Sequence, residues 1–326
     1  MVFDHLENRE AACSILAEQS IRFRTGKTLV PFRLSGNVEW GVPAPYIEGL
    51  EDLTIWVWPE SLWAPISFTK TYLESIGRDK EEWKTWWNSK DSKVYQFIGE
   101  DNIYFYGVAE MAMFAGLFND VSNPPDMTML KLPKLIANNH ILFMDTKASS
   151  SSEIKPPMAS ELLEYYTKDQ LRIHFLSLGL ANKSVSFMPQ VYMEKDKQVG
   201  VDTVLKEGNL LTNVYNRLIR SCFYTAQAYY DLKIPDGKVS EEILIDSEEA
   251  ILEYEKNMYN YQFHSITYVL DSYIRKMNKY WVNNIRVAET EQKDELRKQL
   301  LIDGFHIVKT VAVLLHPIAP DGCELV

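Results

Sequence analysis

The sequence predicts an α/β region followed by an all-α bundle, and two changes of pattern along the chain indicate this. Up to about residue 130, short apolar runs alternate with segments of helical periodicity. Residues 131–200 contain a strand-like segment, a serine-rich loop and a helix. From residue 201 to 326 the apolar period is almost wholly helical. We therefore expect three regions, 1–130, 131–200 and 201–326.

The first region supplies one clear strand and one clear helix. Residues 53–58 (LTIWVW) form an apolar, β-branched and aromatic run of the kind expected in a buried strand. Residues 67–89 carry helical spacing over most of their length. Six of the eight tryptophans lie between positions 56 and 87, where they would fill a core or stack on bases. This succession of strand-like and helical segments is typical of α/β proteins.

The rest of the chain begins with a strand-like segment at 139–144, before the serine loop at 147–151 and a helix from about Ser160. Beyond it, a turn at Pro235-Asp236-Gly237 lies among long helical runs. We expect these helices over residues 203–232, 247–284 and 289–315.

Composition limits the classes of function. The 326 residues are 46% hydrophobic and 24% charged, without an apolar run long enough to span a membrane, so we expect a cytoplasmic protein that contacts no membrane. A formal charge of −11 argues against a DNA-binding protein and against a surface that coats nucleic acid generally. Three scattered cysteines and six histidines without metal-ligand spacing predict neither disulfides nor a zinc site.

Five motifs follow one another in a specific order. They are residues 40–45 (WGVPAP), 47–52 (IEGLED), the run that ends at Trp58, 97–105 (FIGEDNIYF) and the loop that begins at Lys147. Together they resemble the methionyl-tRNA synthetase family, from about Asn37 almost to the C-terminus. The resemblance implies a partial class I Rossmann-like catalytic half-domain followed by an all-α anticodon-binding-type bundle. The His-x-Gly-His signature and the inserted connective domain of that family have no counterpart in the sequence.

The resemblance places a nucleotide site at Gly99, Asp101, Lys147 and Ser149, with Lys147 as the catalytic cation and ATP with Mg²⁺ as the expected cofactor. Amino-acid activation depends on positioning and on cations that stabilise developing phosphate charge. Here the family's K-M-S-K-S loop keeps only its first lysine, because Ser150 replaces the second. Glu100 stands where the family has a lysine. We therefore expect weak activation by the chain alone.

The same resemblance assigns an amino-acid pocket to Trp58, Ser61 and Tyr106. Trp58 matches the family's tryptophan, whereas Pro65 replaces a tyrosine and Tyr106 replaces a histidine. Selectivity for methionine is therefore not implied.

Asn213 and Arg217 stand four residues apart and match the family's anticodon-reading asparagine and arginine. An amide and a guanidinium on one helix face can read unpaired base edges and stack on them. The family's proline-tryptophan pair is replaced by Arg286-Val287, near a helix end, and Trp281 is expected to pack in the core rather than to stack on RNA.

Two classes of function follow. The first is an ATP-dependent ligase that activates an amino acid, with a second polypeptide supplying the missing half of the sheet. The second is a tRNA-binding or regulatory paralogue without catalysis. Because a half-sheet leaves an unpaired edge strand, we also expect residues 10–34, or a second copy of the chain, to cover that edge.

Overall fold

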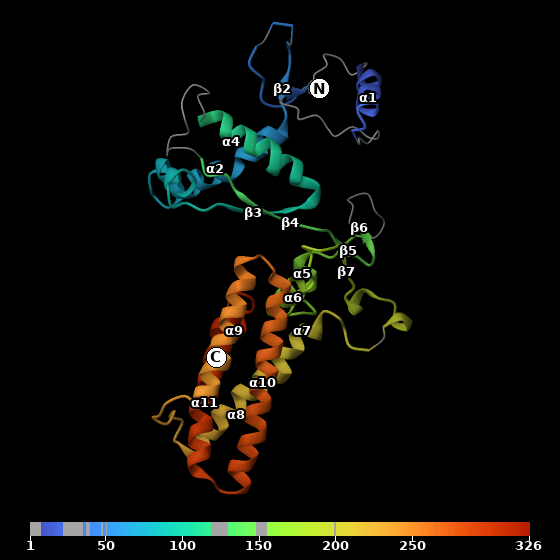
Figure 1. The fold of residues 1–326 in the computed structure, drawn as a ribbon. Coiled ribbons are helices and arrows are strands. Elements are labelled where there is room, and N and C mark those ends of the chain that lie inside the picture. Colours follow the sequence, from blue (N-terminus) through green and yellow to red (C-terminus); the bar gives the residue numbers. More distant parts are fainter. Residues whose placement is uncertain are drawn as a thin grey trace. The chain divides into compact units, whose positions relative to one another are not determined.

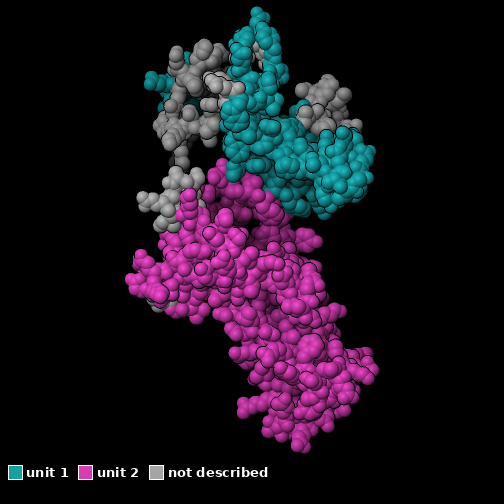
Figure 2. Space-filling view, turned by 180° about the vertical axis from the view of Figure 1, so that it is seen from behind, with its two compact units in different colours: residues 1–96, 102–135 teal, residues 97–101, 136–326 magenta. Residues whose placement is uncertain are grey.

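A computed structural model gives the fold of the chain. The structure describes residues 8–21, 35–36, 40–46, 48–49, 51–118, 130–147, 155–198 and 200–326. The chain divides into two compact units, coloured separately in Figure 2. Unit 1 comprises residues 1–96 and 102–135, and unit 2 comprises 97–101 and 136–326. The three regions expected from the sequence remain a prediction.

Unit 1 begins with helix α1 (Arg9–Glu18) and a short antiparallel pair, β1 (Ser35–Gly36) with β2 (Thr54–Ile55). The strand predicted over residues 53–58 is wrong beyond Ile55, because helix α2 (Val57–Ser75) begins at Val57. Pro59 explains the difference. It has no N–H to donate to a strand ladder, whereas the first turn of a helix tolerates it.

The core of unit 1 gathers the tryptophans. Helix α3 (Trp83–Trp87) follows a 3₁₀ turn (Lys80–Glu82), and Trp83 and Trp87 pack with Ile66, Leu73 and Phe114. The Trp87 indole N–H donates to Thr69 Oγ1 over 3.0 Å. The prediction that residues 67–89 are mostly helical is confirmed.

Strand β3 (Tyr95–Gly99) pairs with β4 (Lys134–Asn138) in a two-stranded sheet. A 3₁₀ turn (Glu100–Asn102), a π-helical segment (Phe105–Ala109) and helix α4 (Glu110–Phe118) follow β3. Strand β4 was not predicted from the sequence. Residues 22–34 lie outside the described residues, so the prediction that 10–34 cover a sheet edge remains untested.

Unit 2 opens with a small mixed sheet in the order β6-β5-β7. Strand β5 (Ile141–Phe143) pairs antiparallel with β6 (Thr146–Lys147) and parallel with β7 (Val185–Phe187). The strand predicted at 139–144 is therefore present in its central part. The helix predicted from Ser160 is the single turn α5 (Ala159–Leu162), and a longer helix, α6 (Lys168–Ser177), begins at a Thr167 cap.

The helical bundle fills the rest of unit 2 (Figure 1). Its elements are α7 (Leu205–Asn209), a π-helical segment (Leu210–Tyr215), α8 (Asn216–Tyr229), α9 (Glu241–Tyr259), α10 (Phe263–Thr290), α11 (Asp294–Leu315) and α12 (Pro320–Glu324). The bundle is confirmed. The run expected over 247–284 is divided between α9 and α10, because Tyr261 has a φ of +57° and ends the helical path. In the described part of the chain, no helix is long and apolar enough to cross a bilayer.

Trp281 occupies the centre of this bundle. Its side chain is 1% exposed, and its indole N–H donates to Ser221 Oγ over 2.9 Å. A Cβ on Gly304 would lie 2.8 Å from the Trp281 ring and 2.8 Å from Cys222 Sγ. Only glycine therefore fits beside the indole, and Trp281 packs in the core, as the sequence predicted.

Candidate functional site

A charged cluster in unit 2 consists of Glu100, Asp101, His140 and Lys147. All of these except His140 were singled out in the sequence. Asp101 lies in the 3₁₀ turn that follows Gly99 at the end of β3, and Lys147 ends β6. Met144 and Asp145 have φ values of +49° and +64°, the combination of a type I′ hairpin turn. The turn pairs Leu142 with Lys147 and so fixes where the lysine leaves the sheet.

His140 lies at the centre of this cluster. Its Nδ1 is 3.1 Å from Glu100 Oε1, and its Nε2 is 3.4 Å from Asp101 Oδ2. The Lys147 ammonium is 4.0 Å from the same Asp101 oxygen. The backbone of His140 is held in turn, since its N–H donates to Ser184 Oγ over 3.2 Å. Two carboxylates thus share one ammonium and one imidazole.

This arrangement does not suit a triphosphate. The cluster carries a net charge of −1 while His140 is neutral, because two carboxylates outnumber one ammonium, and this charge repels an anionic phosphate. The Lys147 side chain is 63% exposed and Asp101 55%, so solvent screens the pair, yet an approaching phosphate must still displace or tolerate two carboxylates. Gly99 ends β3 and is half-buried. Ser149, the fourth predicted residue of the site, lies outside the described residues.

Sequence reasoning missed His140. Its partners lie about 40 positions earlier in the chain, and no local spacing connects them. The available signal was position alone. His140 lies between β4 and β5, and Glu100 follows β3, the strand that pairs with β4.

The predicted amino-acid pocket lies in unit 1, on α2 and the π-helical segment 105–109. Trp58 stacks on Phe105 with ring centroids 3.9 Å apart and planes at 7°. The Ser61 hydroxyl donates its proton to the Trp58 carbonyl over 2.9 Å. This hydrogen bond lies within the first turn of α2. Tyr106 follows Phe105 in the π-helical segment and is half-buried. The structure thus brings Trp58 to the segment that carries Tyr106.

Glu110 begins α4, four residues after Tyr106, and is fully buried. Gln96 Nε2 donates to Glu110 Oε1 over 2.8 Å. Burial raises the pKa of Glu110 to about 7, and the Gln96 hydrogen bond opposes this shift. Within the described residues the other carboxyl oxygen has no hydrogen-bonding partner. Sequence analysis did not single out this residue, because a glutamate in a helix is usually solvated.

Asn213 and Arg217 are both exposed on the bundle. Asn213 belongs to the π-helical segment 210–215 and donates through Nδ2 to Asn209 Oδ1 over 3.1 Å. Arg217 lies in the first turn of α8 and has no ion pair or hydrogen bond from its guanidinium among the described residues. The two side chains are therefore available to a ligand, on helix turns four residues apart.

Arg220 and Tyr224 continue the same row along α8, at spacings of three and four residues. Arg220 Nη2 donates to the Tyr224 hydroxyl over 3.3 Å, and its guanidinium lies 5.8 Å from the ring centroid. Both are exposed. The row offers an amide, two guanidinium groups and an aromatic ring, which are the groups that bind unpaired bases.

Both π-helical segments found among the described residues coincide with predicted ligand-binding motifs. One carries Tyr106 and the other carries Asn213. Such segments make up well under 1% of residues in globular proteins and often occur at functional sites. Their coincidence with two motifs found from the sequence alone supports both assignments.

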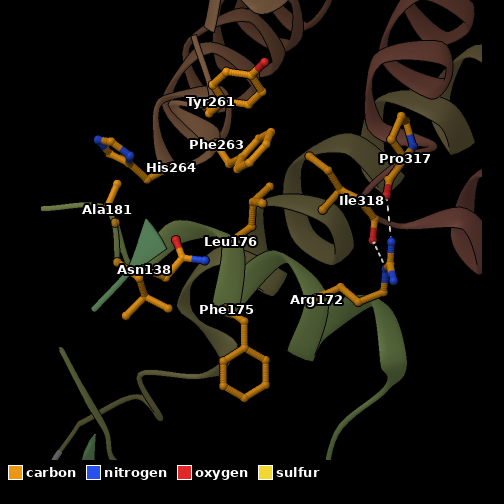
Figure 3. Close-up of a pocket in the computed structure, with 12 residues that line it drawn as sticks. Asn138, Arg172, Phe175, Leu176, Ala181, Tyr261, Phe263, His264, Pro317 and Ile318 are labelled. Atoms are coloured by element: carbon orange, nitrogen blue, oxygen red, sulfur yellow. Dashed lines mark hydrogen bonds between the residues drawn. The ribbon is translucent and has the colours of Figure 1, made fainter. Parts of the chain in front are cut away.

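A hollow of about 410 Å³ lies beside the bundle in unit 2 (Figure 3). Phe175, Tyr261, Phe263 and His264 are among the side chains that line it. Arg172 also lines the hollow. Its Nε donates to the Ile318 carbonyl over 2.7 Å and its Nη2 donates to the Pro317 carbonyl over 2.8 Å, so these two bonds hold its guanidinium in place. The guanidinium therefore ties α6 to the end of α11, and we assign this hollow a structural role.

Comparisons with known proteins agree with these observations. The family model described as tRNA synthetases class I (M) matches residues 5–215. A methionine–tRNA ligase of Thermofilum pendens is 30% identical over 298 residues, which cover 91% of this chain and 49% of that protein. The corresponding ligase of Saccharolobus solfataricus is 27% identical over 92% of this chain and 50% of that protein. The chain thus spans about half the length of these relatives.

Solved structures show the same fold. Methionyl-tRNA synthetase of Mycobacterium tuberculosis in complex with methionyl-adenylate superimposes with a TM-score of 0.67 at 16% identity. The match covers 98% of this chain and 57% of that one. The expected combination of a partial class I catalytic domain and a helical bundle is confirmed. The chain belongs to the class I methionyl-tRNA synthetase family.

Proposed function

We propose that this chain binds tRNA through its helical bundle and, by itself, activates amino acids weakly or not at all. The observation that carries the proposal is the exposed pair Asn213 and Arg217, whose guanidinium has no partner among the described residues. The pair matches the anticodon-reading positions of the family, and Arg220 with Tyr224 lengthens the row. A tRNA anticodon presents unpaired bases, which such groups read and stack on.

The charged cluster supports the second half of the proposal. Activation of an amino acid by ATP requires cations around the phosphates. Here Glu100 and Asp101 lie beside His140 and Lys147, and the two carboxylates offset the positive charge of Lys147. The chain also spans only about half of its relatives. We infer that cations outside this cluster must supply the phosphate binding that aminoacylation requires.

A tRNA-binding titration tests the proposal. Fluorescence anisotropy of a labelled methionine tRNA transcript would be measured with the full chain, with Asn213→Ala and with Arg217→Ala. We expect Arg217→Ala to weaken binding by about 1–3 kcal/mol, the usual contribution of one guanidinium that contacts a base. Asn213→Ala should reduce the preference for the native anticodon over a substituted one.

The matched control is Arg275→Ala, which removes an exposed arginine of α10 that pairs with Asp271. It should leave tRNA binding unchanged. Equal affinity of all four proteins for tRNA would contradict the assignment of the surface, and absence of any binding would contradict the proposed function itself.

The second candidate function is activation of an amino acid, and Lys147 with the Trp58–Phe105 stack favours it. An assay of pyrophosphate exchange distinguishes the two candidate functions. The ligase hypothesis requires exchange of pyrophosphate into ATP, with or without a partner chain, whereas the tRNA-binding hypothesis does not.

A further inference from the structure

The outer face of α9 is unusually apolar for an exposed helix. Leu244, Ile245, Leu252 and Tyr259 are all exposed, Leu252 by 57% and Tyr259 by 79%. The opposite face of α9 packs on α10 and α11, as Figure 1 also shows. Exposed apolar side chains are ordinary when scattered, but several of them gathered on one helix face indicate an interaction site.

These side chains follow a seven-residue repeat. Ile245, Leu252 and Tyr259 form one row, and Leu244 with Ile251 forms a second. Between the two rows runs a third, made by Glu241, Glu248 and Glu255. We call this surface the α9 face. A strict seven-residue repeat keeps a helix facing a helical partner over several turns, as in coiled coils.

A groove of about 380 Å³ adjoins the α9 face. Ile251, Tyr254 and Glu255 line it from α9, and His306, Lys309 and Val313 are among its residues from α11. Val313 is 64% exposed, which extends the apolar surface onto α11. Tyr254 is 6% exposed, and among the described residues neither its hydroxyl nor His306 Nε2 has a hydrogen-bonding partner.

The charge of α9 selects the kind of partner. Over Glu241–Tyr259 the helix carries seven acidic residues and a single basic one, Lys256. Two copies of this face would bring glutamate rows together, which like-charge repulsion opposes. An RNA backbone and an anionic lipid surface are repelled for the same reason. A helix that carries cations between apolar rows complements both the glutamate row and the apolar rows of the α9 face.

We propose that the α9 face is a docking surface for an amphipathic helix of another protein that carries lysine or arginine at seven-residue spacing between apolar rows. Its cations would face Glu241, Glu248 and Glu255, while its apolar side chains cover Ile245, Leu252 and the groove beside Val313. The residues assigned to tRNA, Asn213 and Arg217, belong to other elements, the π-helical segment 210–215 and α8.

Designed peptides test the proposal with the full chain. The probe is a helix of about 24 residues with lysine at every seventh position between leucine rows, and its control has glutamate in place of each lysine. Fluorescence anisotropy at low ionic strength should show binding of the lysine peptide alone. Glu248→Lys with Glu255→Lys should weaken that binding at least about tenfold and create binding of the glutamate peptide. Ile245→Ser with Leu252→Ser should also weaken binding of the lysine peptide.

Glu289→Lys with Glu291→Lys is the matched control, because it reverses two exposed charges near the end of α10. It should leave binding of the lysine peptide unchanged, and circular dichroism should show all variants folded. Three results would overturn the proposal. They are equal binding of both peptides, absence of binding to the lysine peptide, and a dimer in sedimentation that Ile245→Ser with Leu252→Ser dissociates.

Discussion

The Lys147 ammonium lies 4.0 Å from a carboxylate oxygen of Asp101. His140 joins the same carboxylate to Glu100. The lysine that the family resemblance assigns to phosphate binding therefore faces an acidic neighbour. Because electrostatic stabilisation of phosphate charge is usually a large part of phosphoryl-group catalysis, this relationship predicts that the chain binds nucleotide weakly although it keeps the family fold.

Reversing the charge at Glu100 should strengthen nucleotide binding. Glu100→Lys removes a carboxylate and adds an ammonium beside Lys147, and we expect ATP to bind about tenfold more tightly. At this exposed site each charge pair contributes only about 1 kcal/mol. Isothermal titration calorimetry with ATP measures the change. Glu164→Lys, an exposed reversal elsewhere in unit 2, serves as the control. Equal affinities of both variants and the parent chain would show that the cluster does not contact phosphate.

The buried carboxyl of Glu110 should make unit 1 less stable at alkaline pH. Its pKa rises from an ordinary 4.5 to about 7 in the folded chain. The folded state then binds more protons than the unfolded state between these values, so stability falls as pH rises from about 4.5 to 7 and is constant above. The loss amounts to about 3 kcal/mol.

Glu110→Gln tests this linkage by thermal unfolding between pH 5 and pH 8. The variant should lose that part of the pH dependence and unfold at a higher temperature than the parent chain at pH 8. An unchanged profile in the variant would mean that Glu110 is not the titrating group.

A methyl group at Gly304 should destabilise the bundle. The added Cβ of Gly304→Ala would lie 2.8 Å from Trp281 and 2.8 Å from Cys222 Sγ, which forces buried side chains to shift. Overpacking of this kind costs about 1–3 kcal/mol. Urea unfolding followed by tryptophan fluorescence measures it. Val313→Ala, at a 64% exposed position of the same helix, should change stability by no more than about 0.5 kcal/mol.

The bundle was the easiest part of the fold to predict, and the reason is local. Each helix from α8 to α11 repeats its buried positions within a few residues, as Ile266, Leu270, Ile274 and Met277 do in α10. The strand expected at 53–58 failed because an apolar run fits either structure and Pro59 decides in favour of the helix. Strand β4 has five residues, too few for its apolar pattern to distinguish it from a helix or a loop.

The candidate sites were predictable only where a motif carried them. Lys147 and Trp58 came from the ordered motifs, and Asn213 and Arg217 came from their match to the family's anticodon-reading positions. His140 and Glu110 did not, because their partners Glu100 and Gln96 lie 40 and 14 positions away and meet them only in the folded chain. Packing creates the electrostatic environment of both residues, and no sequence period encodes it.

Exchange of labelled pyrophosphate into ATP tests the central claim most directly. The full chain would be assayed alone with each amino acid, methionine included. Background exchange with all of them, from a chain that still binds methionine tRNA, is the result we predict. Amino-acid-dependent exchange by the chain alone, at a rate that Lys147→Ala abolishes, would contradict the account, because the cluster around Lys147 would then be a working phosphate site.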